Sequence, residues 1–235
     1  PKPIKLIRRI LNLVAAQDGD IFLDFFAGSG TSAHALMAAN AEDGINRRFI
    51  AVQVAEPCSE DSEAHRKGFP TISAITLERL RRCGKEVLSS GGRDGWKRDT
   101  GFRLLQIDTS NMADIFYVPD ALNQATLTGL TDNIKPDRTP EDLLFQVMLD
   151  WGVDLALPIA RQTLQGREVF LVDGNALVAC FDAHGGVDED FVKELARVQP
   201  LRVVFRDAGF KDSAVKINVE QIFRLLSPAT EVKCI

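Results

Sequence analysis

One segment near the start of the chain limits its fold more than any other, because a strand, a glycine turn and a helix follow one another between residues 21 and 39. Residues 21–25 are a short apolar and aromatic run, which is typical of a buried strand. The turn at 28–30 follows, and residues 31–39 are rich in alanine, leucine and methionine, which favours a helix. A second apolar run at 49–54 predicts another strand. The segment therefore predicts one parallel, right-handed βαβ unit of an α/β domain.

The rest of the chain divides at a linker. Residues 89–95 (Ser-Ser-Gly-Gly-Arg-Asp-Gly) have a linker composition, so we predict domains at 1–95 and 101–235. The first domain should add helices at 3–16 and 76–88 to the βαβ unit. The second should be a smaller α/β domain with these elements: a strand at 101–107, a helix from the Thr139-Pro140 start to 151, a hairpin at 168–181, a helix at 188–198, a strand at 201–205, a helix at 219–226 and a strand at 231–235.

Composition and charge exclude several classes of protein. The formal net charge is −5, whereas a free-standing DNA-binding domain is normally basic, so any main DNA-binding surface should lie outside this chain. The basic cluster Arg79, Arg81, Arg82 and Lys85 is interpreted as the solvated face of a helix. Four cysteines without a Cys-x-x-Cys pair predict no metal and no disulfide framework, and reduced thiols fit the cytoplasm. No apolar run is long enough to cross a membrane.

The glycine turn has the chemistry of a site for an anionic group. Glycines allow a ligand to approach the backbone, and the following helix offers free N–H groups with a partial positive charge. A phosphate or the carboxylate of a methionine moiety would suit this position. Residues 28–33 also fit the G-x-G-x-x-A dinucleotide fingerprint, but a nicotinamide site needs an acid after the second strand, where this chain has Gln53. A structural turn without a ligand is a third alternative.

Several stretches resemble one family of enzymes. Asp-Phe-Phe-Ala-Gly-Ser-Gly-Thr at 24–31 is similar to the S-adenosylmethionine motif of DNA amino-methyltransferases of the beta arrangement. In that arrangement a Lys-Pro helix directly precedes the glycine motif, and Lys2-Pro3 matches it. The stretch at 46–53, with 201–207 and 218–221, resembles the modification subunits of type III restriction-modification systems. The resemblance therefore covers nearly the whole chain.

The resemblance implies a fold, a cofactor and a set of site residues. The fold would be the cofactor half of a Rossmann-like methyltransferase sheet, followed by the smaller α/β domain. The cofactor would be S-adenosylmethionine, with Gln53 beside its ribose. His34, one helical turn further on, is assigned a surface or packing role. The implied cofactor-binding residues are Lys2, Pro3, Asp24, Phe26, Ala27, Gly28, Ser29, Gly30, Thr31 and Gln53.

The resemblance also implies an activity and partners. The full-length enzyme would transfer a methyl group to the exocyclic amine of adenine at a specific DNA site. Its partners would be DNA, a second copy of the subunit in a homodimer, and the restriction subunit of the same system. The second domain would serve subunit association.

One departure from the family pattern bears on activity. These enzymes hold the target base with an Asp-Pro-Pro-Tyr type motif, and this chain contains no Pro-Pro pair. We therefore expect the chain to be a C-terminal portion that has no catalytic residues of its own and is inactive alone. The strand at 21–25 should then lie at the edge of its sheet with uncovered apolar surface. Two alternatives remain: a nicotinamide-dinucleotide-dependent oxidoreductase domain and a non-catalytic assembly module.

Overall fold

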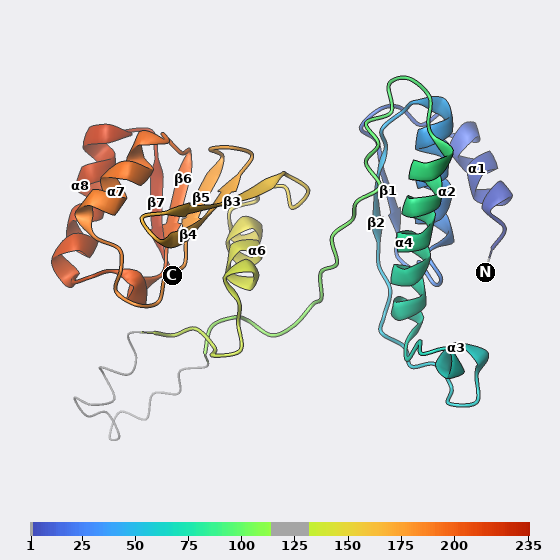
Figure 1. Cartoon of the computed structure of the whole chain (residues 1–235), viewed down its shortest axis with the longest axis horizontal. Helices are drawn as coiled ribbons and strands as arrows, with labels where there is room; N and C mark the ends of the chain where they lie inside the picture. Colours follow the sequence, from blue (N-terminus) through green and yellow to red (C-terminus); the bar gives the residue numbers. More distant parts are fainter. Residues whose placement is uncertain (1, 114–131) are drawn as a thin grey trace. The chain divides into compact units, whose positions relative to one another are not determined.

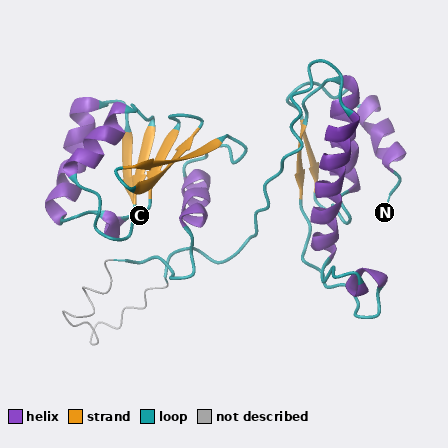
Figure 2. Cartoon of the chain, in the orientation of Figure 1, coloured by secondary structure: helices purple, strands orange, loops and turns teal. Residues whose placement is uncertain are grey.

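The computed structural model describes residues 2–113 and 132–235, and the chain forms two compact units, Pro1–Leu104 and Leu105–Ile235. Both units mix helices with strands, as Figure 2 shows. The predicted linker at 89–95 lies inside the first unit, directly before the buried Trp96. Within the described ranges, no helix is long and apolar enough to span a membrane.

The first unit is built around a two-stranded parallel sheet. Strands β1 and β2 pair in register from Ile21 opposite Arg48 to Asp24 opposite Ala51, and α2 is the helix that connects them (Figure 1). The predicted βαβ unit is therefore confirmed. The elements of this unit are α1 (Ile4–Leu13), β1 (Ile21–Asp24), α2 (Thr31–Asp43), β2 (Arg48–Ala51), α3 (Glu63–Arg66) and α4 (Ile72–Ser90).

Helix α2 forms the centre of the first unit, because it packs against α1, α4 and β2. One side of α2 buries Met37 against Leu80 and Cys83 of α4, and the other buries Leu36 against Leu11 of α1. The opposite face of the sheet is apolar and partly exposed, with side chains from both strands and the residue after β2: Ile21, Leu23, Ile50 and Val52. Strand β1 thus lies at a sheet edge with uncovered apolar surface, as the sequence predicted.

The second unit contains a five-stranded mixed sheet in the order β3-β4-β5-β6-β7. The first three strands pair antiparallel, and β5, β6 and β7 pair parallel through the crossover helices α7 and α8. The elements are α6 (Pro140–Asp150), β3 (Ile159–Leu164), β4 (Arg167–Val172), β5 (Leu177–Cys180), α7 (Glu189–Arg197), β6 (Arg202–Phe205), the 3₁₀ helix η2 (Asp207–Gly209), α8 (Ser213–Leu226) and β7 (Glu231–Cys234).

Both faces of this sheet are covered by helices, which explains its apolar strands. Helices α7 and α8 pack side by side on one face over Val203 and Phe205, while α6 packs on the other over Val204 and Phe170 (Figure 1). Residues 203, 204 and 205 alternate between the two cores because successive strand side chains point to opposite faces. All three are fully buried.

Two strand assignments differ from the sequence analysis. The strand predicted at 101–107 is wrong, because this stretch has no regular secondary structure and instead uses Phe102 to pack against the core of the first unit. Strand β3 was not predicted. Its central side chains are exposed, so it lacks the apolar alternation that marks a half-buried strand. The hairpin predicted around Asp173-Gly174 is confirmed as β4–β5.

Candidate functional site

The glycine turn lies at the carboxyl end of β1 and leads directly into α2. The Ala27 amide donates a hydrogen bond to the Val52 carbonyl at 3.1 Å, which ties the turn to the neighbouring strand. The Gly30 amide donates to the Ala27 carbonyl at 2.8 Å, which closes the turn on itself. Parallel sheets bind ligands outside this end of their strands, so the turn occupies a position suited to ligand contact.

The two glycines of the turn have different surroundings. Gly30 is the N-cap of α2 with φ +74°, and a Cβ there would lie 2.9 Å from Thr76 Cγ2. Gly28 has φ +54°, but a Cβ there would meet nothing closer than the Phe26 carbonyl oxygen at 3.9 Å. The positive φ favours glycine at both positions, while packing demands it only at Gly30. Gly28 therefore faces open space, where a ligand can approach the backbone.

Asp24 braces the turn with its carboxylate. One oxygen accepts a hydrogen bond from the Phe26 amide at 3.0 Å, and the other accepts from the Ser32 hydroxyl in the first turn of α2. The carboxylate thus joins the end of β1 to the start of α2. The Phe26 side chain is 92% exposed, so its ring adds nothing to the core and is available to cover a ligand.

Gln53, two residues beyond β2, lies beside the turn. Its Oε1 accepts a hydrogen bond from the Gly28 amide at 2.7 Å, and its Nε2 donates to the Val54 carbonyl at 3.0 Å. The side chain therefore supports the turn in this structure.

Lys2 and Pro3 lie just before α1. Both are exposed, and α1 packs against α2. The Pro3 carbonyl accepts a hydrogen bond from the Leu6 amide in the first turn of α1. In the described ranges, no hydrogen bond joins Lys2 or Pro3 to the glycine turn.

No side chain caps the N-terminus of α2 in the described structure, although α4, α6, α7 and α8 each begin with a side-chain cap. The first amides of a helix have no acceptor within the helix, and together they carry a partial positive charge. The start of α2 is therefore suited to an anionic group such as a carboxylate or a phosphate.

Helix α4 contributes two side chains to the turn that sequence reasoning missed. The Thr76 hydroxyl donates to the Gly28 carbonyl. Arg79 Nη1 donates to Ser29 Oγ at 3.0 Å, to Thr31 Oγ1 at 2.8 Å and to the Ser29 carbonyl at 3.3 Å. Arg79 belongs to the cluster assigned to a solvated face, and for this residue that assignment is wrong. Its spacing from the buried Thr76 and Cys83, three and four residues away, places it on the packed face of the helix.

His34 lies one turn into α2 and contacts the same arginine. Arg79 Nε donates to His34 Nδ1 at 3.2 Å, so this nitrogen must carry a lone pair and the proton of the neutral ring is on Nε2. Burial lowers the pKa of His34 below the ordinary value of 6.5, and the charge of Arg79 lowers it further, while Glu86 acts in the opposite direction. The packing role predicted for His34 agrees with these contacts.

We expect NMR titration of the His34 ring to give a pKa below 6.5. The unfolded chain then takes up this proton before the folded chain does, so the contribution of His34 to stability is retained above pH 6.5 and lost as the pH falls below it. An Arg79→Met substitution should raise the His34 pKa towards 6.5, because the charge is removed while the burial remains. A wild-type pKa at or above 6.5 would contradict the contact between the two residues.

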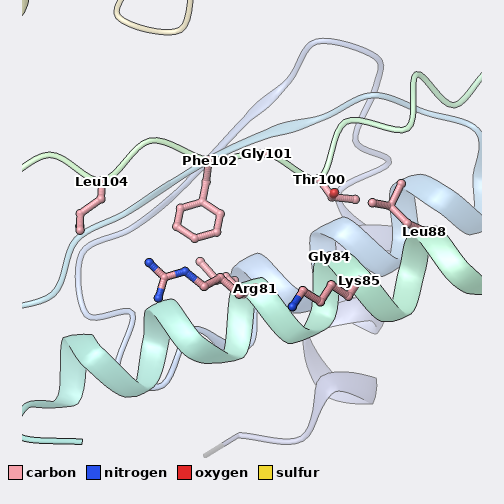
Figure 3. A pocket seen from close by; sticks show the side chains of 9 residues that line it. Arg81, Gly84, Lys85, Leu88, Thr100, Gly101, Phe102 and Leu104 are labelled. Atoms are coloured by element: carbon pink, nitrogen blue, oxygen red, sulfur yellow. The ribbon is translucent and has the colours of Figure 1, made fainter. Parts of the chain in front are cut away.

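An open groove of about 440 Å³ runs along α4 on the side that packs against residues 100–104 (Figure 3). Arg81 and Lys85 of α4 lie on one side of it, and Phe102 points towards the helix from the other. The chain passes so close to α4 that a Cβ at Gly84 would lie 3.2 Å from Thr100 Cβ. None of residues 24–31 lines this groove, so it is separate from the glycine turn.

Comparison with known proteins places the turn within a recognised sequence family. Residues 1–62, which include α1, the glycine turn and β2, match the DNA methylase family. The chain is 35% identical to the Mod subunit of the type III restriction-modification enzyme EcoP15I from Escherichia coli, over 95% of this chain and 33% of that protein. It is 34% identical to the type III StyLTI Mod subunit of Salmonella typhimurium strain LT2, over 58% of this chain and 22% of that protein.

A third relative is a type II enzyme. The type II methyltransferase M.KpnI of Klebsiella pneumoniae is 42% identical over 34% of this chain and 19% of its own length. The chain thus spans about a third or less of the length of these relatives. The chain is therefore similar to a type III Mod subunit over almost its whole length in the EcoP15I comparison, and over rather more than half of its length in the StyLTI comparison.

Proposed function

We propose that the first unit binds S-adenosylmethionine at the glycine turn, as the cofactor-binding part of a DNA methyltransferase. The observation that carries this proposal is an uncapped helix N-terminus beside a glycine, Gly28, whose Cβ side is open, within a segment that matches the DNA methylase family. S-adenosylmethionine carries a carboxylate, which suits the α2 amides. Bound there, its sulfonium group would supply the methyl that is transferred.

The residues of the turn have separate roles in this proposal. The backbone of Gly28 and Ser29 and the amides at the start of α2 would receive the amino-acid end of the cofactor. Gln53 would lie near the ribose hydroxyls while it supports the turn. Phe26 would cover the ligand with its exposed ring. The remaining proposed contacts are Lys2, Pro3, Asp24, Ala27, Gly30 and Thr31.

For the whole protein, we propose methylation of the exocyclic amine of adenine at a specific DNA site. The support is the similarity to Mod subunits of two type III enzymes. The first unit would then be one part of a Rossmann-like methyltransferase sheet, and its partners would be DNA, a second copy of the subunit and a restriction subunit. This chain would increase the rate of methyl transfer by positioning the cofactor against the target amine.

Titration with two cofactors tests the proposal against a nicotinamide-dependent activity. We expect S-adenosylmethionine at 100 times its Kd to stabilise the chain by about 2.7 kcal/mol, which should appear as a rise in melting temperature. NAD⁺ should give no shift at the same concentration, because the position after β2 that would bind its ribose holds Gln53 in place of an acid.

The outcomes of this titration separate the alternatives. Calorimetry should give one S-adenosylmethionine site per chain. Binding of NAD⁺ but not of S-adenosylmethionine would favour the oxidoreductase. Binding of neither would overturn the proposal and favour an assembly module with a purely structural turn.

A further inference from the structure

We propose that Arg79 is a positioning residue, which holds the glycine turn in the conformation that receives the carboxylate of the cofactor. The inference rests on the proposed S-adenosylmethionine site and goes beyond it, because Arg79 lies on α4, 48 residues after Thr31, the first residue of α2. Its side chain contacts only residues of the turn and of α2 in the described hydrogen bonds.

The contacts of Arg79 orient both hydroxyl groups that flank Gly30. Ser29 Oγ and Thr31 Oγ1 are the side-chain oxygens on either side of the N-cap position, where an oxygen commonly caps the first helical amides. Here both oxygens accept from Arg79 Nη1 and neither caps α2. The first amides of α2 lack a side-chain cap because the N-cap residue is glycine, and Arg79 fixes the orientation of the two hydroxyls on either side of it.

The charge of Arg79 also favours a carboxylate at the start of α2. The partners described for it are two hydroxyls, a carbonyl and an imidazole, and no carboxylate forms an ion pair with it in the described ranges. Arg82, by contrast, pairs with Glu78 at 2.7 Å. A partly buried cation without a counter-ion is unfavourable, and its field adds to the partial positive charge at the start of α2. An incoming carboxylate would supply the missing counter-ion and would lie in this positive field.

The planar guanidinium suits this role better than an ammonium group would. Nε is used for His34 while Nη1 reaches the turn, so one rigid group joins α2 to the turn in a fixed orientation. Lysine would retain the charge, but it cannot make the contacts to His34 and to the two hydroxyls in the same geometry. An Arg79→Lys variant should therefore be intermediate.

Two ligands that differ at the amino-acid end provide the test. We would measure the Kd of S-adenosylmethionine and of 5′-methylthioadenosine, which lacks the amino-acid portion, with the whole chain. If Arg79→Met leaves the turn competent in about a tenth of the molecules, the Kd of S-adenosylmethionine rises about tenfold. The Kd of 5′-methylthioadenosine should change less than about twofold, since that ligand does not use the α2 amides. ¹⁵N spectra should show that the S-adenosylmethionine-induced shifts at Ser29 and Thr31 decrease in the variant.

Arg82→Met is the matched control, because Arg82 lies on the same helix and its side chain is 75% exposed. This substitution should leave both Kd values unchanged. Equal losses for the two ligands, or no loss for S-adenosylmethionine, would overturn the role of Arg79 and leave the proposed function standing. A wild-type chain that binds neither ligand would overturn the proposed function itself. Should Arg79→Met fail to fold, the Arg79→Lys variant replaces it. Its Kd for S-adenosylmethionine must then rise more than its Kd for 5′-methylthioadenosine.

Discussion

A Gly30→Ala variant is expected to lose about 2–4 kcal/mol of unfolding free energy, from left-handed backbone strain and overpacking together. Gly30 has φ +74°, and the new Cβ would lie 2.9 Å from Thr76 Cγ2 and 3.7 Å from Leu80 Cδ2. Both neighbours lie on the buried face of α4, so the methyl group would force α2 and α4 apart. Hydrogen exchange should show weaker protection of residues 31–43 in the variant.

Gly28→Ala is the matched control for this substitution, because it adds the same methyl group at a positive φ but in open space. Its stability should fall by only about 1–2 kcal/mol, from the backbone conformation alone. Cofactor binding should nevertheless be lost, because the methyl group would occupy the side from which the ligand approaches. A Gly30→Ala chain as stable as the Gly28→Ala chain would contradict the packing of the turn against α4.

Phe205→Ala is expected to cost the second unit about 3–5 kcal/mol. Phe205 is fully buried at the end of β6, which lies between β5 and β7, and its ring centroid is 5.3 Å from that of Phe210 and 6.3 Å from that of Phe223. Removing the ring opens a cavity between the sheet and α8. Denaturant unfolding with hydrogen exchange should show early loss of protection in β5, β6 and β7.

The first unit should not respond to this change. The clusters of buried apolar side chains each lie within one unit, and Phe205 belongs to the cluster under α7 and α8. Exchange protection of α2 and the affinity for S-adenosylmethionine should therefore remain at wild-type values. Leu225→Ala serves as a control, because Leu225 is 81% exposed and its removal should change stability by less than about 0.5 kcal/mol. A parallel loss in both units would show that their folding is coupled.

The succession of strands, turns and helices over short stretches of the chain was determined by the sequence. The apolar run at 21–25, the glycines of the turn and the helix after them predict a βαβ unit, and β1 pairs with β2 in parallel around α2. The caps Thr139 and Asp188 likewise mark helix starts that the structure retains. These signals are local because capping, glycine conformation and apolar periodicity act over a few residues.

The contacts that shape the candidate site were decided by the tertiary structure. Arg79 is charged and lies in a basic cluster, so its sequence context predicts solvent, yet the packing of α4 on α2 brings it to Ser29, Thr31 and His34. The stretch at 101–107 likewise has strand-like composition, but within the described ranges it pairs with no strand, and Phe102 packs instead against the buried cluster between α2 and α4. In both cases the outcome depends on a partner distant in the sequence, which no local pattern specifies.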